Sequence, residues 1–358
     1  MKKFFKKFKF LIISALVVPM IFIILGVVPT GYDLYVPATV DDIKEVYEFD
    51  NYDNSNVNVY SVSILCYYKI SVLTLIEAKM NPFAVLDEHN DFVNTSINYQ
   101  YSSGSIQKNV SLTNALIAGF KKSEKDINYK FHGDIIHSIY GQTQSPFKIG
   151  DIIIECEGYE ITEDLNVTQA LVKKFGTKKQ ADGNYYVNLN LNDKYEFKVL
   201  RNKEEVTIEA STFLYEVDNI KIPILGISTY PYYTVLSSSI KYHITAPSSF
   251  GPSAGLMQSL YIYDVLSNSS LTKNLKIVGT GTVDVNGNAG AIGGVKAKVV
   301  AAYLSGADIF FVPSANYEEA LEMHDKLNIK MKLVEVKNLD DAINYLKKYQ
   351  NGSIESRV

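Results

Sequence analysis

Residues 250 to 255 read Phe250-Gly251-Pro252-Ser253-Ala254-Gly255, and an apolar run from Leu256 to Leu266 follows them. The run has the composition of a buried helix, so Ser253 should lie where that helix begins. Backbone N–H groups at a helix start are unpaired and face the positive end of the dipole, so they can stabilise a developing oxyanion. Serine is also a common N-cap residue, and on this stretch alone the capping role is the commoner one.

A second segment, Gly293-Gly294-Val295-Lys296-Ala297-Lys298, begins another predicted helix that runs to Leu304. The positions i, i+3, i+4 and i+7 on its apolar face are Val295, Lys298, Val299 and Ala302. Lys296 lies about 200° around the helix from Lys298. Because a buried ammonium loses hydration, we expect the pKa of Lys298 to fall, and a neutral lysine can accept a proton from a serine hydroxyl. The alternative is that both lysines extend to water.

Together the two segments resemble the peptidase domain of the Lon family, whose pattern is G-P-S-A-G for the nucleophile and G-G-V-K-x-K for the base. The resemblance covers roughly residues 237 to 349 and implies that Ser253 is the nucleophile and Lys298 the general base. It also implies that Thr280, in Val278-Gly279-Thr280-Gly281-Thr282, hydrogen-bonds the lysine. Ala254 adjoins Ser253 and is a supporting residue. The residue before G-P-S-A-G, often polar or glycine in that family, is Phe250, which alters the site near the leaving group.

Composition excludes several other classes of protein. A length of 358 residues suggests two or three domains, and a net charge of −4 makes nucleic acid an unsuitable partner. The two cysteines, Cys66 and Cys156, are far apart and belong to no metal motif, so we expect neither a metal site nor a disulfide framework. Among the five histidines, His243 is nearest the serine motif, and its context favours the end of a strand over a base. No cofactor is expected.

The N-terminus has the pattern of an uncleaved membrane anchor. Residues 2 to 9 carry five lysines, and residues 10 to 29 carry no charge and are almost wholly apolar. Twenty helical residues span about 30 Å, the thickness of the hydrocarbon layer, and no A-x-A-like cleavage site follows. The lysines should hold residues 1–30 as a cytoplasmic tip and single membrane pass, so that everything after Thr30 lies outside the plasma membrane.

Residues 31–128 carry no chemical motif, and we expect a mixed strand and helix region that positions the next module. Residues 57 to 75 are rich in Val, Ile and Tyr and predict strands, whereas residues 90 to 107 are polar and predict a loop. Ser111 is placed to cap a helix in which Leu112, Leu116 and Phe120 recur at four-residue spacing.

Residues 129–213 resemble a PDZ domain. The segment Phe147-Lys148-Ile149-Gly150-Asp151-Ile152-Ile153-Ile154 has the G-D-x-I form of bacterial PDZ domains. A helix should follow from Asn166 to Phe175, and then a hairpin that turns at Asn202-Lys203. In PDZ domains a groove beside that helix takes an extended peptide as an added strand. The stretch from Gly176 to Asp193 is longer and more polar than that family usually carries, which leaves the groove residues open.

Residues 214–350 alternate strands with helices, which implies an α/β layer with parallel strands. We expect strands over residues 240–245, 276–285, 308–312 and 331–336, a helix beginning at Asn316 with an Asn316/Glu319 capping box, and a helix over residues 339–349. The expected fold class is therefore an α/β (α+β) Lon-type proteolytic domain, preceded by a PDZ domain and an N-terminal transmembrane helix. Residues 351–358 form a polar tail.

The sequence thus predicts a membrane-anchored serine endopeptidase with a Ser-Lys dyad and a PDZ module for substrate recruitment. No G-x-x-x-x-G-K-[ST] loop occurs, so we expect ATP-independent activity. The expected partners are membrane or secreted proteins or peptides, as substrates, and the lipid bilayer through residues 10–29, and assembly into a homo-oligomer is left open. The alternative is a catalytically silent membrane adaptor whose whole function is PDZ peptide binding.

Overall fold

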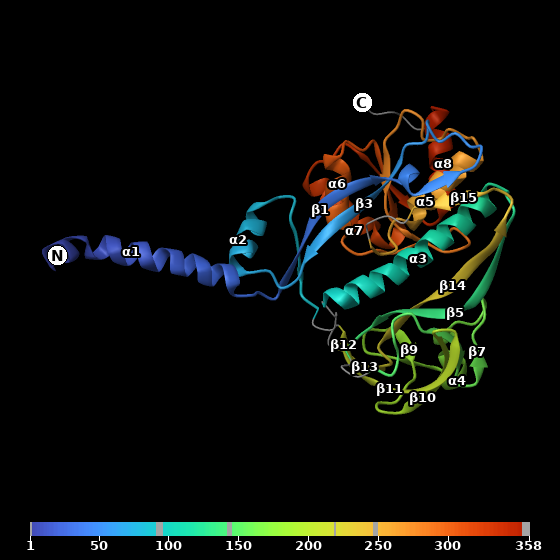
Figure 1. The fold of residues 1–358 in the computed structure, drawn as a ribbon, viewed down its shortest axis with the longest axis horizontal. Coiled ribbons are helices and arrows are strands. Elements are labelled where there is room, and N and C mark those ends of the chain that lie inside the picture. The colour runs from blue at the N-terminus through green and yellow to red at the C-terminus, as the bar shows by residue number, and fades with distance from the viewer. Residues whose placement is uncertain (1, 91–95, 142–144, 218–219, 246–249, 353–358) are drawn as a thin grey trace.

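The computed structural model describes residues 2–90, 96–141, 145–217, 220–245 and 250–352. The chain forms two lobes, and helix α1 (Lys2–Val27) projects from the larger lobe as a separate stem (Figure 1). Helix α3 (Ile97–Lys122) lies between the lobes in the view of Figure 1.

The larger lobe is built on a six-stranded sheet. Its strand order is β20-β19-β16-β3-β1-β4, in which the first four strands are parallel to one another and β1 and β4 are antiparallel to their neighbours. The strands are β1 (Tyr32–Asp42), β3 (Val59–Tyr67), β4 (Val85–Glu88), β16 (Ile277–Gly279), β19 (Ile309–Pro313) and β20 (Lys332–Val336). Four short strands form two further two-stranded pairs, β2 (Tyr47–Phe49) with β15 (Tyr242–Ile244), and β17 (Thr282–Val283) with β18 (Ala289–Gly290).

Helices cover both faces of this sheet because its central strands are apolar on both sides. Ile277 and Phe311 face one core, with α3, α5 (Gly255–Leu266) and α8 (Leu339–Gln350). Val278 and Phe310 face a second core, with α6 (Val295–Leu304) and α7 (Tyr317–Lys326). The alternation of neighbouring side chains between the two cores is the period of a strand buried on both faces. The predicted α/β layer with parallel strands is therefore present.

The larger lobe includes residues that the sequence assigned to a separate region. Strand β3, from residues 31–128, pairs in parallel with β16, so that Val59 lies opposite Ile277 and Ser61 opposite Gly279. Residues 31–128 therefore supply half of the strands of the sheet that carries the serine and lysine motifs, instead of packing beside it as a module of their own.

The smaller lobe is an antiparallel sheet of order β11-β10-β6-β5-β14, with β7 paired to β6 and α4 packed against it. Its elements are β5 (Ile127–Ile139), β6 (Ile152–Cys156), β7 (Tyr159–Glu160), α4 (Val167–Phe175), β8 (Thr177–Lys179), β9 (Tyr185–Val187), β10 (Lys194–Arg201), β11 (Glu204–Ser211), β12 (Phe213–Val217), β13 (Ile220–Ile224) and β14 (Ile227–Ser238). The helix after Asn166 and the hairpin turn at Asn202-Lys203 are where the sequence predicts them.

The smaller lobe is inserted into the larger one. The chain leaves the larger lobe after α3, enters β5 at Ile127, and returns at the end of β14, where Ser238 is paired with Ile127. Because β5 and β14 form one long antiparallel ribbon, both connections pass through the same place (Figure 1). Residues 214 to 238, which the sequence assigned to the proteolytic domain, thus belong mostly to the smaller lobe.

Three local predictions in residues 31–128 are wrong. Of the expected loop over residues 90–107, residues 91–95 lie outside the described part, but residues 97–107 are the first turns of α3. Ser111 is inside this helix instead of at its start, because the polar face of its first half is buried against the serine loop of the larger lobe. The strand expected through Leu75 ends at Tyr67, and α2 (Val72–Met80) follows, capped by Ser71.

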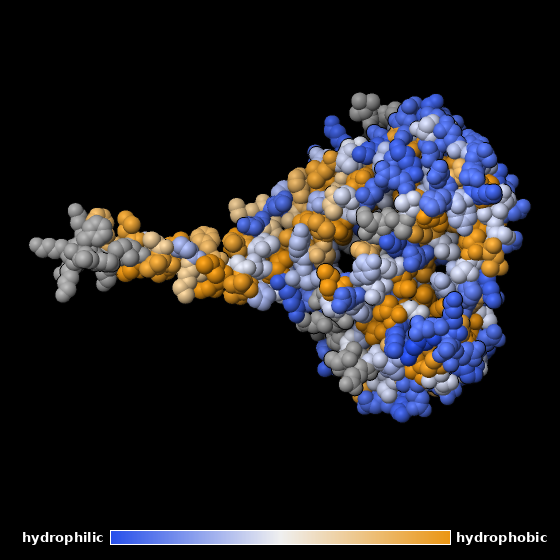
Figure 2. Space-filling model, in the orientation of Figure 1, coloured by the Kyte–Doolittle hydropathy of each residue, from blue (hydrophilic) through white to orange (hydrophobic). Residues whose placement is uncertain are grey.

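Helix α1 makes few contacts with the rest of the protein. Apart from Ser14, its described side chains from Phe10 onward are apolar and mostly exposed, and Figure 2 shows a largely hydrophobic stem beside a mixed surface. It joins the larger lobe through hydrogen bonds of Val72 N–H to Val28 O (3.1 Å) and Thr30 N–H to Ile70 O (2.8 Å). Taken over the described residues, no helix combines the length and apolar character of a membrane span.

Candidate active site

Ser253 lies in a tight turn that leads directly into α5. Ala254 is the N-cap residue of this helix, and Gly255 is its first residue. The turn is held from two sides, because Ser111 Oγ of α3 donates to Pro252 O (2.9 Å) and Gly281 N–H donates to Ser253 O (2.8 Å). The serine hydroxyl is therefore presented by a fixed backbone at the start of a wholly buried helix.

Lys298 reaches Ser253 from α6. Its side chain is buried, with 4% exposed, and its Nζ lies 2.7 Å from Ser253 Oγ and 3.2 Å from Thr280 Oγ1. Among the residues that the structure describes, no carboxylate pairs with Lys298, and burial lowers its pKa from 10.5 to about 7. An amine with this pKa is substantially neutral near pH 7 and can accept a proton from the hydroxyl beside it.

The other lysine of the pair, Lys296, points away from the serine. Its ammonium lies 2.7 Å from the carboxylate of Glu322 on α7, at the protein surface. The predicted helix register is therefore confirmed, since Lys298 is on the apolar face of α6 and Lys296 is not. Gly294 allows α6 to begin here, because its φ of +67° favours glycine and a Cβ atom would lie 2.3 Å from Ile64.

Thr280 connects the two residues. Its hydroxyl donates to Ser253 O (3.1 Å) and accepts from Lys298 Nζ (3.2 Å). The strand predicted over residues 276–285 is interrupted at Thr280 and Gly281, between β16 and β17, and this break lets both residues turn toward the serine loop. The threonine that the resemblance implies is thus placed beside the lysine.

Replacing Thr280 with valine is expected to lower kcat roughly fivefold without abolishing activity, because valine keeps the shape but removes about 1 kcal/mol of hydrogen bonding that orients the amine. Steady-state kinetics on an unfolded protein substrate measure this effect. Thr280→Ser, which keeps the hydroxyl, is the matched control and should retain most of the activity. A Thr280→Val enzyme with wild-type kcat would show that the hydroxyl does not orient Lys298.

Two backbone N–H groups at the serine turn are available to a substrate. The N–H of Gly255 donates to Pro252 O (3.2 Å), and that of Leu256 donates to Gly281 O (3.0 Å). Within the part of the chain that the structure describes, the N–H groups of Ser253 and Ala254 donate to no other residue. They lie next to the nucleophilic oxygen and at the positive end of α5, where an oxyanion would be stabilised.

The serine and lysine open into a cavity of about 810 Å³. Three walls come from outside the two sequence motifs: the edge of β3, the part of β1 around the bulge between Pro37 and Val40, and side chains of α3 and β14. The residues of these walls that the sequence did not indicate are Ala38, Thr39, Asp41, Ser61, Val62, Ser63, Ile64, Leu65, Gln107 and Tyr230. Nothing in their local sequence marks them as site residues, because contacts between segments distant in the chain bring them to Ser253.

Phe250, the departure from the family pattern, is held on α3. A Cβ atom added to Gly104 of α3 would lie only 2.9 Å from the Cβ of Phe250, so the two segments are in close contact. The Phe250 ring packs edge-on against Tyr101, with the ring centres 5.2 Å apart, and the Lys108 ammonium lies 5.2 Å from the Phe250 ring centre. The ring remains about half exposed and lines the cavity. It gives one side of the site an aromatic wall.

Asn316 has a different role from the predicted cap. It precedes α7, but its side chain makes no capping hydrogen bond, and no capping box forms with Glu319. Instead its amide accepts from Ile292 N–H and donates to Ile292 O, both at 2.9 Å. Because Ile292 lines the cavity, this bidentate contact fixes the loop in front of α6 and thereby the cavity wall.

The remaining candidate groups take no part in the site. His243 is exposed in β15 and does not line the cavity. Cys66 and Cys156 are free thiols, and burial raises the pKa of Cys156 to about 12, which makes it unreactive. No cluster of metal-binding side chains occurs in the described residues.

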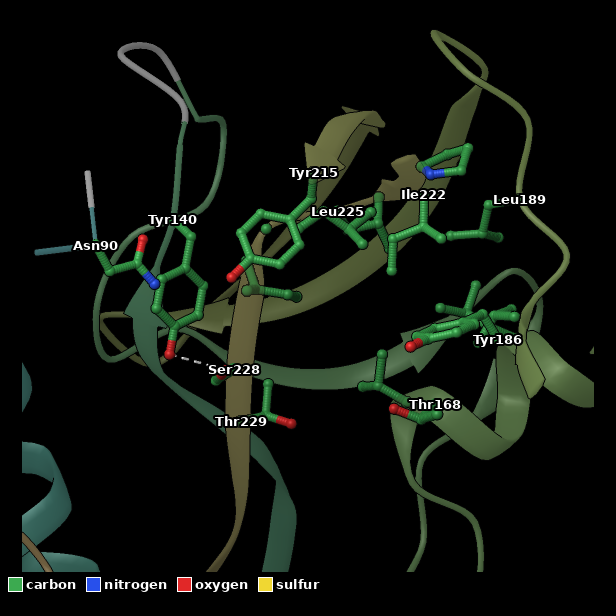
Figure 3. A pocket seen from close by; sticks show the side chains of 17 residues that line it. Asn90, Tyr140, Thr168, Tyr186, Leu189, Tyr215, Ile222, Leu225, Ser228 and Thr229 are labelled. Carbon is green, nitrogen blue, oxygen red and sulfur yellow. Dashed lines mark hydrogen bonds between the residues drawn. The ribbon is translucent and has the colours of Figure 1, made fainter. Parts of the chain in front are cut away.

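A second cavity, of about 520 Å³, lies in the smaller lobe. Figure 3 shows it between β14, which carries Ser228 and Thr229, and α4, which carries Thr168, with Tyr215 and Tyr186 on opposite sides. Its lining is largely apolar and includes Val167, Leu171, Leu189, Ile222 and Leu225. The polar segment from Gly176 to Asp193, between α4 and β10, contributes Tyr186, Val187 and Leu189 to the lining of this groove. The groove is therefore larger than the space between α4 and β14 alone.

Comparison with known proteins identifies part of the chain. Residues 234–348 match the family model described as the Lon protease (S16) C-terminal proteolytic domain. The chain is 30% identical over 105 residues to a Lon protease of Aster yellows witches'-broom phytoplasma, covering 28% of this chain and 13% of that protein. It is 32% identical over 106 residues to a Lon protease of Elusimicrobium minutum, covering 28% of this chain and 12% of that protein.

A Lon protease of Malacoplasma penetrans is likewise 32% identical over 111 residues, covering 30% of this chain and 14% of that protein. The chain thus spans only about one eighth of the length of these relatives. Residues 234–348 are therefore similar to a Lon-type proteolytic domain, and they lie within a mixed α/β fold.

Proposed function

We propose that this protein is a membrane-anchored, ATP-independent serine endopeptidase that uses Ser253 and Lys298 as a catalytic dyad. The observation that carries the proposal is the 2.7 Å separation of Lys298 Nζ and Ser253 Oγ, together with a lysine pKa near 7. Burying a lysine without a carboxylate partner costs folding free energy, so a purely structural role does not account for it. General base catalysis needs a base whose pKa lies near the working pH, and Lys298 meets this requirement.

The chemistry follows from the positions of these groups. Ser253 Oγ bonds to the scissile carbonyl carbon while its proton passes to Lys298 Nζ, and the N–H groups of Ser253 and Ala254 stabilise the oxyanion. The C–N bond then breaks, and the proton on Lys298 goes to the leaving amine. A water molecule attacks the acyl-enzyme with Lys298 again accepting its proton, the acid product leaves, and the proton returns to Ser253.

The edge of β3 beside the serine is suited to an extended substrate. Ile277 N–H donates to Asn58 O (3.1 Å), so the backbone groups of every second residue of β3 face β16. Strand β16 ends at Gly279, opposite Ser61, and the next residues of β3, Val62 to Leu65, line the cavity with Ser253. A peptide added at this edge would present its backbone to the nucleophile.

The test of the proposal is cleavage of an unfolded model protein by the purified full chain, together with labelling by a serine-reactive probe. Both should depend on Ser253. The alternative adaptor predicts peptide binding without cleavage or labelling. If wild type and Ser253→Ala behave alike in both assays, the peptidase proposal is wrong.

We also propose that the smaller lobe is a PDZ-type recruitment domain. The support is the G-D-x-I segment before β6, the helix α4 beside a sheet edge, and the apolar groove between α4 and β14. A groove of this kind binds an extended peptide as an added strand and holds its side chains in apolar pockets.

Membrane anchoring through α1 is proposed from the uncharged run of residues 10–29 and from the exposed apolar side chains of the stem, for example Phe10, Met20 and Ile23. Apolar surface of this extent is normally covered by lipid or protein. The five lysines before Phe10 favour retention of the N-terminus in the cytoplasm.

Protease added outside intact cells with accessible membranes is therefore expected to digest the region after Thr30 and to leave an N-terminal epitope intact. Immunoblotting with tags at both ends measures this, and detergent permeabilisation is the control that exposes the N-terminus. Complete protection of both ends before permeabilisation would overturn the proposed orientation and place the catalytic domain in the cytoplasm.

A further inference from the structure

One strand, β14, lines both cavities. Ser228 and Thr229 line the groove of the smaller lobe, and the next residue, Tyr230, lines the cavity that contains Ser253 and Lys298. Thr229 and Tyr230 are adjacent, so their side chains leave opposite faces of β14, and the two cavities adjoin the strand at this point. A chain that lies along the edge of the strand can reach both.

That edge of β14 is open. The strand is the last in its sheet, and in the described residues only β5 pairs with it. Ile139 of β5 lies opposite Ile227. The N–H of Ile139 donates to the Tyr99 hydroxyl (2.6 Å), and the same hydroxyl donates to the C=O of Ile139 (2.9 Å), so neither backbone group of Ile139 faces β14. Ile227 therefore belongs to a pair without mutual hydrogen bonds, and its N–H and C=O point away from β5.

The backbone polar groups of every second residue of β14, from Ile227 to Pro231, point toward the open edge. Two and four residues after Ile227, Thr229 and Pro231 direct their backbone toward the same open edge. Proline has no N–H, and it is tolerated in a strand where the missing donor would face solvent. A peptide added to β14 can thus pair with Ile227 and Thr229, and the ladder ends at Pro231, beside the residue that lines the catalytic cavity.

The start of β14 fixes the direction of such a peptide. In the described part of the chain, the N–H groups of Leu225 and Gly226 have no acceptor. Gly226 has φ +69°, and a Cβ there would lie 2.5 Å from the Phe213 ring, so a residue without a side chain is needed. Adjacent free N–H groups in such a turn bind a carboxylate. A substrate C-terminus held there runs antiparallel to β14, and its upstream residues lead toward Ser253.

We propose that the groove and the catalytic cavity form one substrate path along β14. The free, apolar C-terminal tail of a protein substrate is held at Leu225 to Thr229, and the same chain is cut a short and constant number of residues upstream of its terminus. This inference rests on the proposed function, because it takes Ser253 as the nucleophile. When the tail is bound, the cleavage step becomes effectively intramolecular. The local concentration of the scissile bond at Ser253 is then highest when only a short stretch of chain joins that bond to the bound tail.

The experiment uses the full chain and a disordered reporter protein that ends in a short apolar tail with a terminal leucine. Spacers of increasing length are inserted just before the tail, and mass spectrometry locates the cuts. The expected result is that the cut position keeps its distance from the terminus as the spacer grows. Cuts that stay at the same reporter sequence, irrespective of the terminus, would overturn the single path.

Two changes test the contacts that hold the tail. Thr229→Pro removes one N–H at the open edge and leaves the pairing with β5, whereas Thr229→Val keeps the N–H and is the matched control. Thr229→Pro should raise KM for the tailed reporter roughly five- to tenfold, the effect of one hydrogen bond, and Thr229→Val should stay near wild type. Amidation of the reporter tail, which removes the carboxylate, should weaken cleavage by the unaltered enzyme to a similar extent.

A tailless unfolded protein separates this inference from the proposed function. Its Ser253-dependent cleavage by the unaltered enzyme tests the proposed function without any tail, and circular dichroism shows whether Thr229→Pro is folded. If Thr229→Pro loses activity on both substrates, the amidated tail on the wild-type enzyme decides the question. Equal rates on free and amidated tails would overturn carboxylate capture, whereas failure to cleave any substrate in a Ser253-dependent manner would overturn the proposed function instead.

Discussion

Lys298→Ala is expected to abolish proteolysis as completely as Ser253→Ala, with a loss of at least roughly 10³-fold in kcat. The lysine Nζ is the base nearest the serine oxygen, at 2.7 Å, and members of a catalytic unit are non-additive, so the double variant should be no worse than either single one. Lys298→Arg should not restore activity, because a guanidinium stays protonated and cannot accept the serine proton.

Lys296→Ala is the matched control, since it removes a lysine two positions away on the same helix. Lys296 is paired with Glu322 at the surface, so its loss should leave kcat within a few-fold of wild type. Single-turnover cleavage of an unfolded protein and probe labelling measure all five variants. An active Lys298→Ala beside an inactive Lys296→Ala would contradict both the assignment of the base and the role of the helix register.

The local part of the site could be predicted from the sequence. The spacing of Val295, Lys298 and Val299 determines which lysine is buried, because helix periodicity acts over a few residues. The turn at Ser253 could be placed for the same reason, since the mainly apolar run from Leu256 to Leu266 follows it almost directly. Both motifs act through elements whose residues are adjacent in the chain.

The rest of the site depends on pairings between distant segments. Strand β3 is beside Ser253 because Val59 pairs with Ile277, and no local pattern reports that contact. The insertion of the smaller lobe is hidden for the same reason, since it is defined by the pairing of Ile127 with Ser238. A linear division of the chain into modules therefore separated residues that build one sheet.

Single polar residues were also difficult to interpret. Asn316 occupies a capping position, but Ile292 offers both an N–H and a C=O to its amide, and two hydrogen bonds outweigh one cap. Ser111 would cap a helix that began after it, yet the preceding polar turns are helical and its hydroxyl bonds to Pro252 O. In both cases the tertiary partner, which the sequence does not contain locally, decides the role.

The rate of proteolysis should rise with pH, about tenfold per unit below pH 7, and level off above it, because only the neutral form of Lys298 accepts the serine proton. Burial lowers the pKa of Lys298 from 10.5 to about 7, so the midpoint of kcat against pH should lie near 7. Substrate binding that excludes further water would move the midpoint lower. The measurement is kcat between about pH 5.5 and 9 on an unfolded protein substrate.

The free energy of unfolding must be measured over the same pH range, because the pKa of Lys298 differs between the folded and unfolded chain and therefore also affects stability. Between pH 7 and 10.5 the unfolded chain holds the Lys298 proton and the folded chain does not, so this residue makes stability rise with pH in that window. Below pH 7 both states are protonated and its contribution is constant. A loss of rate below pH 7 without a parallel Lys298-dependent loss of stability therefore reports the catalytic base. A rate that is flat through pH 7 and rises only near pH 10 would mean that Lys298 is an ordinary solvated lysine.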